Sequence, residues 1–263
     1  MSDLFQNPIQ INGTVFFASD FHLGSPDKIH SLQRERLIVE WLDEIKKEAT
    51  HLFLLGDIFD FWFEYHDVVP KGYFLFLSKL AELRASGIDI TVFTGNHDMW
   101  MKNYLIDELG VTIYRKETAF LINGKRCLIG HGDGLGDGDW GYKIIKILFA
   151  FRFNQWLFGW LHPRIAFALA RFFSRKSRAM TGRNDEVFRG NEREVIVQYA
   201  LKMLQKNEID YFIYGHRHLP LNIALSDTAT YLNSGDWLVH NSYLRADELS
   251  QQIELCFFVS LQN

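Results

Sequence analysis

Five short apolar runs in this chain each end in a cluster of Asp, Asn or His, and four of these clusters begin with glycine. Apolar runs of this length that stop at a polar loop are typical of buried strands. In an α/β sheet, ligands bind outside the carboxyl ends of the strands, so five such ends meet at one crevice. Glycine permits sharp turns and close approach of the backbone to a ligand. The sequence therefore predicts an α/β fold with one polar site at its strand ends.

The side chains in these clusters are typical of a transition-metal site. Mixed imidazole, carboxylate and amide oxygen suits Mn, Fe, Zn or Co rather than Ca. Any one cluster alone is typical of an ordinary turn or loop, but five in a chain of 263 residues favour a shared metal site. The predicted metal ligands are Asp20, His22, Asp57, Asn96, His131, His216 and His218.

The order of the predicted elements indicates two β-sheets. Strands alternate with helices in the first part of the chain, and Asn123-Gly124 between two apolar runs predicts a tight hairpin. The predicted elements are strands at 14–19, 51–55, 88–94, 118–122, 125–129 and 211–214, helices at 32–48, 73–85 and 192–205, and further strands to 259. This pattern predicts two sheets packed face to face with helices outside, an α/β/β/α sandwich.

Residues 140–184 interrupt this pattern. They hold 11 aromatic residues and nine Lys or Arg, and no Asp or Glu. We predict a helical insertion, or lid, of two helices hinged near His162-Pro163, in a catalytic domain formed by 1–139 and 185–263. Three roles stay open: a hairpin packed on the domain with solvated charges, an interfacial membrane anchor, or a lid over an acyl-binding cleft. The last two are compatible.

Other sequence features concern the cellular location and the partners of the protein. The first ten residues lack the basic and apolar regions of a signal peptide, and no uncharged apolar run reaches 18 residues. Cys127 and Cys256 lie in apolar runs and are expected to be reduced. These features predict a cytoplasmic protein. Nucleic acid is not an expected partner, because the basic residues of 140–184 stand among apolar ones rather than along a polar groove.

The five clusters, in this order, resemble the motifs of the calcineurin-like metallophosphoesterase family: D-x-H, G-D-x-x-D, G-N-H-D, G-H and G-H-x-H. The resemblance covers the core from about 14 to 237. It implies two sheets flanked by helices and a pair of metal ions that hydrolyse phosphoesters. It also implies two ligand sets: Asp20, His22, Asp57 and His218 for one metal, and Asp57, Asn96, His131 and His216 for the other. Asp57 would bridge the two.

Three neighbouring residues receive roles beside the metals. His97 follows the ligand Asn96 and is a candidate catalytic residue that donates to a phosphoryl oxygen or protonates the leaving oxygen. The alternative is a structural histidine that lies beside the metal ligands without contacting the substrate. Asp98 is predicted to hold the His97 ring by accepting its other N–H. Asp60 is expected to orient a metal ligand rather than to be one.

Within that superfamily, the chain resembles the UDP-2,3-diacylglucosamine pyrophosphatases. The shared features are S-D-F-H-L, G-D-I-F-D-F-W, H-G-D-x-L followed by D-x-x-Y, and an aromatic insertion containing R-I-A that ends in serines and basic residues. The resemblance implies Mn ions and cleavage of a lipid-linked sugar nucleotide to UMP and diacylglucosamine 1-phosphate at the inner membrane face. The candidate substrate contacts are Asp139, Tyr142, Arg171, Ser174, Ser177 and Arg217.

Two residues depart from the pattern of that narrower group. His97 stands where its best-known members have Arg, and Arg217 stands where Thr is usual. Arg217 is interpreted either as a phosphate contact or as a solvated residue. The alternative function is therefore a soluble phosphodiesterase or phosphatase that acts on nucleotides or small phosphoesters. A binding scaffold without catalysis would lack ligands, and none is missing from the motifs.

Overall fold

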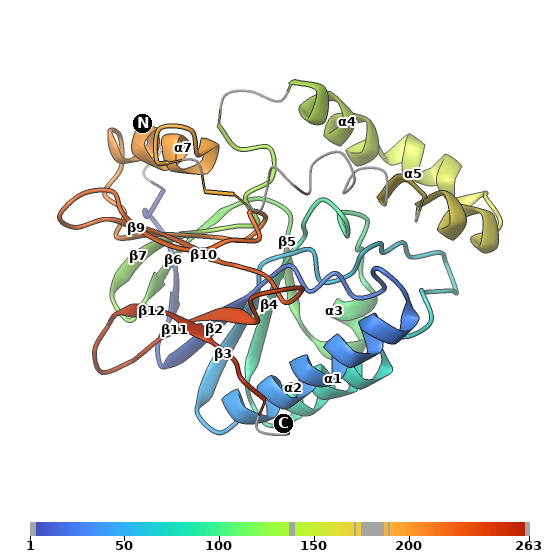
Figure 1. Cartoon of the computed structure of the whole chain (residues 1–263), viewed down its shortest axis with the longest axis horizontal. Coiled ribbons are helices and arrows are strands. Elements are labelled where there is room, and N and C mark those ends of the chain that lie inside the picture. Colours follow the sequence, from blue (N-terminus) through green and yellow to red (C-terminus); the bar gives the residue numbers. More distant parts are fainter. Residues whose placement is uncertain (1–3, 137–139, 171, 175–186, 189, 261–263) are drawn as a thin grey trace.

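Two six-stranded β-sheets form the centre of the protein (Figure 1). The computed structural model describes residues 4–136, 140–170, 172–174, 187–188 and 190–260, without the side chains of 140–142, 144 and 145. Sheet A contains, in spatial order, β1 (Ile9–Ile11), β6 (Thr118–Ile122), β7 (Lys125–Ile129), β8 (Tyr211–Tyr214), β10 (Thr230–Ser234) and β9 (Pro220–Ala224). Sheet B contains β12 (Ile253–Phe257), β11 (Ser242–Ala246), β2 (Thr14–Ala18), β3 (Ala49–Leu54), β4 (Asp89–Phe93) and β5 (Thr112–Tyr114).

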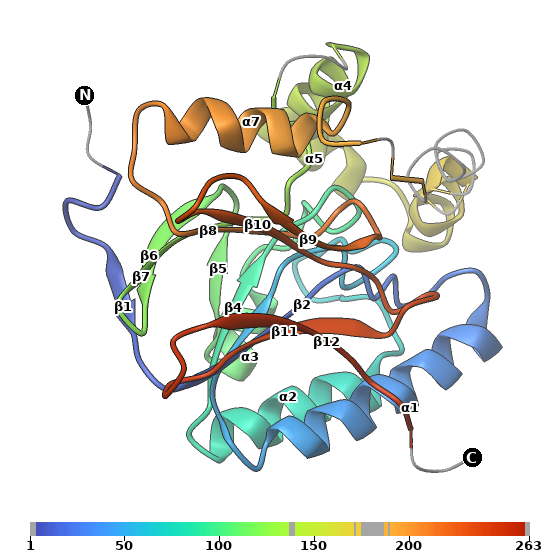
Figure 2. The ribbon, with the colours of Figure 1, turned by 60° about the vertical axis from the view of Figure 1, so that its left-hand side comes forward.

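Helices cover the outer faces of both sheets. Figure 2 shows α7 (Val195–Leu204) over sheet A, and α1 (Lys28–Ile45) and α2 (Phe74–Ala85) under sheet B. Buried apolar side chains of α1 and α2 join the core on the outer face of sheet B, and those of α7 join a core with sheet A. The predicted α/β/β/α sandwich is thereby confirmed.

The alternation of side chains along each strand divides the core. In β2, Val15 and Phe17 lie in the cluster between the two sheets, whereas Phe16 and Ala18 lie in the cluster beneath α1 and α2. Successive strand residues point to opposite faces, so a strand buried on both sides is apolar throughout. This explains why the four buried residues of β2, 15–18, are all apolar.

Parallel pairing brings the polar strand ends to one edge. β2, β3, β4 and β5 are parallel neighbours in sheet B, and β7 and β8 are parallel neighbours in sheet A. Their carboxyl ends are followed by the clusters at 20–22, 57, 96, 131 and 216–218. The fold thus positions all five clusters at the same crevice.

The predicted elements agree with the observed ones best where turn chemistry is strong. The hairpin strands β6 and β7 and the strand β8 have the predicted bounds. Helix α1 begins at Lys28 rather than at 32, because the carboxylate of Asp27 accepts the N–H groups of Ile29 and His30 at 2.8 and 3.0 Å. The short elements β1, β5 and α3 (Tyr104–Leu109) were not predicted.

The insertion differs from the predicted pair of helices. The segment before Pro163 is two helices, α4 (Trp140–Ala150) and α5 (Arg152–Gly159), because Phe151 adopts an extended backbone with φ −69° and ψ 119°. A further helical stretch covers 163–170 and 172–174, so the hinge at Pro163 is present. The division into a catalytic domain and a lid stays a prediction.

The lid contacts the core through a few aromatic groups. The Phe158 ring lies 4.9 Å from that of Phe63 and 4.7 Å from that of Trp100, between centroids. The indole N–H of Trp100 donates to the Phe149 carbonyl at 2.7 Å. Ala166 is fully buried. These contacts fix the lid beside the carboxyl ends of the strands. Within the described residues, no helix is long and apolar enough to cross a membrane.

The loop that follows β2 is held by a buried guanidinium. Arg34 of α1 donates from Nε to the Phe21 carbonyl at 2.6 Å, and from Nη2 to the carbonyls of His22 and Ser25 at 2.7 and 2.6 Å. Its side chain is almost fully buried. Buried carbonyls without donors are costly, so Arg34 stabilises both the loop and its docking on α1.

We expect Arg34→Met to lower the free energy of unfolding by about 2–4 kcal/mol, because it leaves buried carbonyls without a donor. The measurement is urea unfolding followed by circular dichroism. Arg36→Met is the matched control, since Arg36 is exposed on the same helix and its loss should change stability little. Equal stability of the two variants would contradict the role of Arg34.

Candidate metal site

Asp20, His22 and His218 form one group of possible ligands. Asp20 and His22 follow β2, and His218 follows β8 of the other sheet. The Nε2 atoms of His22 and His218 lie 3.2 Å apart, and Oδ1 of Asp20 lies 3.3 Å from Nε2 of His218 and 3.7 Å from Nε2 of His22. All three donor atoms face one point, as the ligands of a cation do.

Asp57, His131 and His216 form a second group, with Asn96 beside it. Oδ2 of Asp57 lies 3.5 Å from Nε2 of His131, and Oδ1 of Asn96 lies 3.3 Å from the same nitrogen. The rings of His131 and His216 have centroids 5.1 Å apart. Nδ1 of His131 lies 2.7 Å from the Leu55 carbonyl. When the Nδ1–H donates to this carbonyl, Nε2 is left to face the other ligands of the group.

Asp57 lies between the two groups. Its Oδ2 atom, 3.5 Å from His131 in the second group, is also 3.7 Å from Nε2 of His22 in the first. Its Oδ1 atom accepts the N–H of His97 at 2.8 Å. One carboxylate thus faces both groups, which is the arrangement that a bridging ligand needs. The structure brings together all seven residues that the sequence predicted as ligands.

Five of these seven residues have a left-handed backbone. The φ angle is positive at Asp20, His22, Asp57, His216 and His218, from 43° to 70°. This conformation is unfavourable for residues with a Cβ and costs about 1–2 kcal/mol each. Such strain gathers at functional sites and persists where surrounding structure enforces it. The turns thereby aim Asp-x-His and His-x-His side chains at one point.

Two motif glycines make room for the carboxylates. A Cβ on Gly95 would overlap the carboxylate of Asp57, and one on Gly215 would overlap Ser19 and the carboxylate of Asp20. Each glycine comes directly before a predicted ligand. The G-N and G-H motifs therefore require glycine because a neighbouring acid occupies the space of a side chain.

The buried carboxylates draw positive charge to the site. Burial opposes ionisation of Asp20 and Asp57, yet the neighbouring imidazoles, His218 and His131 foremost, hold the pKa of both carboxyls well below the usual range. Burial likewise opposes protonation of His131, but Asp57 raises its pKa to about 10. Burial, with His131 nearby, lowers the pKa of His216 to about 4. Of these two imidazoles, His131 is thus suited to carry a proton and His216 is not.

The donor set fits divalent cations. Within the described residues, Oδ1 of Asp20 and Nδ1 of His22 are buried atoms without a hydrogen-bond partner. Buried polar atoms normally have partners, so such atoms indicate a bound ion. Carboxylate oxygens and imidazole nitrogens at two adjacent points suit a pair of transition-metal ions.

The surroundings of His97 differ from the prediction for Asp98. The Asp98 carboxylate accepts the backbone N–H groups of Gly95 at 2.7 Å and Ile58 at 2.8 Å, so it braces the loops rather than the ring. Nδ1 of His97 lies 3.1 Å from the Asp60 carbonyl. The predicted Asp98–His97 contact was therefore wrong, because the tight loop offers Asp98 nearer N–H donors.

Asp60 links the site to the lid. Its Oδ1 atom lies 3.9 Å from Nδ1 of His22 and 3.8 Å from Nδ1 of His97, as expected for a residue that orients a ligand. The same atom accepts the hydroxyl of Ser174, which is buried in the lid, at 3.0 Å. Ser174 thus reaches the edge of the site. Asp60, His22 and His97 also form a third group of possible metal ligands.

Of the other predicted substrate contacts, the structure describes only the side chain of Arg217. Arg217 donates from Nε and Nη2 to the buried carboxylate of Glu194 at 2.8 and 2.9 Å, so it is not a solvated surface residue. Its contact with substrate stays a prediction. Asp139, Arg171, Ser177 and the side chain of Tyr142 lie outside the described residues.

Sequence reasoning missed Asp236. Its Oδ2 atom lies 3.5 Å from Nδ1 of His218, and it follows β10 and Gly235, whose φ is 71°. An acid at this position orients the imidazole and fixes the nitrogen that faces the metal point. The signal was present, because Ser234-Gly235-Asp236 is another strand end with glycine and an acid.

Comparisons with known proteins agree with this geometry. The family described as calcineurin-like phosphoesterase matches residues 13–220. A UDP-2,3-diacylglucosamine hydrolase of Porphyromonas gingivalis is 35% identical over 87% of this chain and 92% of its own length. One of Yersinia pseudotuberculosis is 25% identical over 93% of this chain and 99% of its own.

The solved structures that this chain resembles have lower sequence identity to it than these relatives. A crystal structure from Thermus thermophilus has 11% identity and a TM-score of 0.46, and it covers 94% of this chain and 99% of its own. The assignment therefore depends on the family match and on the curated relatives, together with the strand-end geometry. The chain belongs to the calcineurin-like phosphoesterase family, a family of metal-dependent phosphoester hydrolases.

Proposed function

We propose that this protein hydrolyses the pyrophosphate of UDP-2,3-diacylglucosamine to UMP and diacylglucosamine 1-phosphate, a step of lipid A synthesis. The observation that carries the proposal is the 35% identity with a UDP-2,3-diacylglucosamine hydrolase over nearly the whole of both chains. The two ligand groups and the exposed aromatic side chains of the lid support the same substrate.

We assign the two metal positions to the two observed groups. Asp20, His22, Asp57 and His218 would hold one ion, and Asp57, Asn96, His131 and His216 the other. Manganese is the proposed metal, and iron, zinc or cobalt suits the same donors. Two such ions supply a lowered pKa of coordinated water and offset the charge on the phosphoryl oxygens.

His97 is the proposed proton donor or phosphoryl contact. Its backbone N–H is fixed by Asp57 and its Nδ1 lies next to the Asp60 carbonyl, so its ring is held at the edge of the first group. The Nε2 atom is left to face the substrate. A histidine in this place can donate a hydrogen bond to a phosphoryl oxygen or a proton to the leaving oxygen.

The lid supports contact with a membrane surface. Many of its large apolar side chains are exposed: Ile147, Leu148, Phe149, Phe151, Phe153, Trp156, Leu157, Trp160, Ile165, Leu169, Phe172 and Phe173. Patches of this kind mark interaction surfaces. Because a diacylated substrate resides in a bilayer, we infer that this lid face enters the inner membrane interface, where Trp and Phe are favoured and Lys and Arg meet anionic headgroups.

The substrate assignment is tested by product analysis. Purified protein with Mn and UDP-2,3-diacylglucosamine in mixed micelles should release UMP, measured by chromatography. Bis(p-nitrophenyl) phosphate serves as a generic diester. Turnover of the diester without release of UMP would support the alternative, a soluble phosphodiesterase or phosphatase of small phosphoesters.

Variants of Asp57 and His97 separate metal binding from chemistry. Asp57→Ala should lose both metal equivalents, because the carboxylate faces both groups. His97→Ala should keep two equivalents while kcat falls by about 10²–10⁴, the range for general acid catalysis. Metal content is measured by elemental analysis after gel filtration. Asp227→Ala, at an exposed turn, is the control for Asp57. Two metals retained in Asp57→Ala would refute the bridging role.

The membrane contact is tested on the two most prominent tryptophans. Trp156→Ser combined with Trp160→Ser should reduce co-sedimentation with anionic liposomes several-fold, because apolar area is lost from the interface. Hydrolysis of bis(p-nitrophenyl) phosphate should be unchanged, since neither residue lines the crevice. Undiminished liposome binding would show that this face does not meet the bilayer.

A further inference from the structure

A buried ion pair joins helix α7 to the last two predicted ligands. Arg217 lies in the chain between His216 and His218, and its Nε and Nη2 atoms donate to the two carboxylate oxygens of Glu194 at 2.8 and 2.9 Å. The side chain of Glu194 is 4% exposed and that of Arg217 is 14% exposed. Paired hydrogen bonds between a guanidinium and a carboxylate fix direction as well as distance. The contact therefore holds the residue that connects two ligands.

Glu194 is itself fixed at the start of α7. Its carbonyl accepts the N–H of Gln198 at 3.0 Å, whereas its side chain makes no capping hydrogen bond to the helix. An acid at a helix start commonly accepts the N–H groups of its own helix. Here the carboxylate is directed to Arg217 instead. Ile196, two positions further along, is buried in the core that α7 shares with sheet A. The ligand turn is thereby tied to a helix that the core holds.

Helix α7 also packs on the loop that carries His131. A Cβ on Gly132 would lie 3.0 Å from Cδ1 of Ile196, so this loop fits closely against the first turn of the helix. The N–H of Gly215 donates to the His131 carbonyl at 3.0 Å and connects the loop with the turn at 216–218. The start of α7 thus contacts both segments that bring histidines from sheet A to the metal groups.

The turn between the two histidines depends on its surroundings. His216 and His218 have φ angles of 70° and 54°, in the left-handed region that residues with a Cβ avoid. Backbone in such a conformation persists where the surrounding structure enforces it. The N–H of His216 donates to Oδ2 of Asp20 at 2.9 Å, and the pair of Arg217 with Glu194 holds the middle of the turn. Loss of the pair would allow both imidazoles to move.

The charge of the pair is balanced. A guanidinium next to two metal ligands would repel divalent cations if it stood alone, because charges interact strongly in a poorly hydrated site. The carboxylate of Glu194 offsets the charge of Arg217 at 2.8 Å. The arginine can therefore hold the turn without opposing the metal ions.

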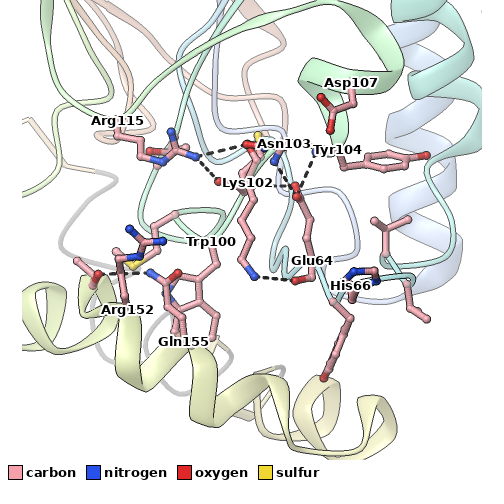
Figure 3. A pocket seen from close by; sticks show the side chains of 18 of the residues that line it. Glu64, His66, Trp100, Lys102, Asn103, Tyr104, Asp107, Arg115, Arg152 and Gln155 are labelled. Carbon is pink, nitrogen blue, oxygen red and sulfur yellow. Dashed lines mark hydrogen bonds between the residues drawn. The ribbon is translucent and has the colours of Figure 1, made fainter.

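The described cavities point away from a substrate contact for Arg217. A cavity of about 950 Å³ lies between the core and the lid (Figure 3). In the described part of the chain, its lining residues include acids, bases and aromatic rings, but neither Glu194 nor Arg217. The described residues around a smaller cavity of about 270 Å³, which His131 lines, also include neither. A role through the neighbouring ligands therefore fits Arg217 better than a contact inside either cavity.

We propose that Glu194 and Arg217 form a positioning pair that fixes His218 for the first metal ion and His216 for the second. The inference rests on the metal positions of the proposed function. Neither member of the pair is a ligand, so the pair acts through the turn and through its balanced charge. Because one histidine serves each group, breaking the pair weakens both metal positions together.

Calorimetric titration of the metal-free protein with Mn tests this role. Glu194→Gln and Arg217→Met should each bind both metal equivalents about tenfold to a hundredfold more weakly, the range for residues that hold metal ligands. Glu194→Gln should show the larger loss, because it leaves an unpaired cation beside the metal positions. The double variant should lose less affinity than the two single changes combined, since the two residues act as one unit.

Co-loaded protein gives a second readout, because the visible absorption of cobalt depends on the geometry of its ligands. Both single variants should shift these bands, with folding checked by circular dichroism. Glu48→Gln is the matched control, since Arg245 donates from Nε and Nη2 to the Glu48 carboxylate at 3.3 and 2.9 Å. Glu48 precedes β3, at the edge of sheet B opposite to Asp57. Its replacement should change neither the Mn affinity nor the Co spectrum.

The outcomes separate three roles. Lower stability with wild-type Mn affinity and an unchanged Co spectrum would overturn the inference and leave the pair a structural one. A higher KM in Arg217→Met alone, with Glu194→Gln like wild type in KM and metal affinity, would overturn it by placing Arg217 on the substrate. If the wild-type protein releases no UMP from UDP-2,3-diacylglucosamine while the variants still lose metal affinity, the proposed function is rejected and the positioning role stands.

Discussion

Two buried carboxylates on adjacent strands, Asp20 and Asp57, impose the main constraint on this structure. Neither is stable as an ion inside a protein without opposite charge at close range. Imidazoles from both sheets gather around them, and a pair of cations meets the same demand. Positive φ values at Asp20 and Asp57 and the glycines that leave room for their carboxylates help to hold these acids, and Arg34 holds the loop that follows Asp20. The helical layers supply the burial that makes the turns rigid.

The two sheets contribute unequally to the site. Sheet B brings Asp20, Asp57 and Asn96 from three parallel neighbours, and sheet A brings the histidines that follow β7 and β8. Packing of the sheets therefore sets the distance between acids and imidazoles. A relative shift of the sheets would separate the ligands of each ion. The core between the sheets thus serves the chemistry as well as the stability of the protein.

Much of the fold and the ligand set could be predicted from the sequence, because strand ends and turn residues carry strong local signals. The hairpin at Asn123-Gly124 is present, and the seven predicted ligands lie close together in the structure. The partner of Asp98 was not predicted correctly, because hydrogen bonds inside a tight loop depend on backbone directions that no residue pattern records. Asp236 was missed although Ser234-Gly235-Asp236 carries the same signal, a strand end with glycine and an acid. Its role beside His218 shows only once β8 and β10 lie next to each other.

The hydrogen bond between Ser174 and Asp60 joins a residue of the lid to a carboxylate that borders both His22 and His97. Thermodynamic linkage makes such a connection work in both directions. Whatever alters the charge or position of the acid alters the free energy of docking the helical segment, and displacement of that segment alters the environment of the imidazoles. We therefore expect a ligand bound beside His22 and the docking of the segment that carries Ser174 to affect each other.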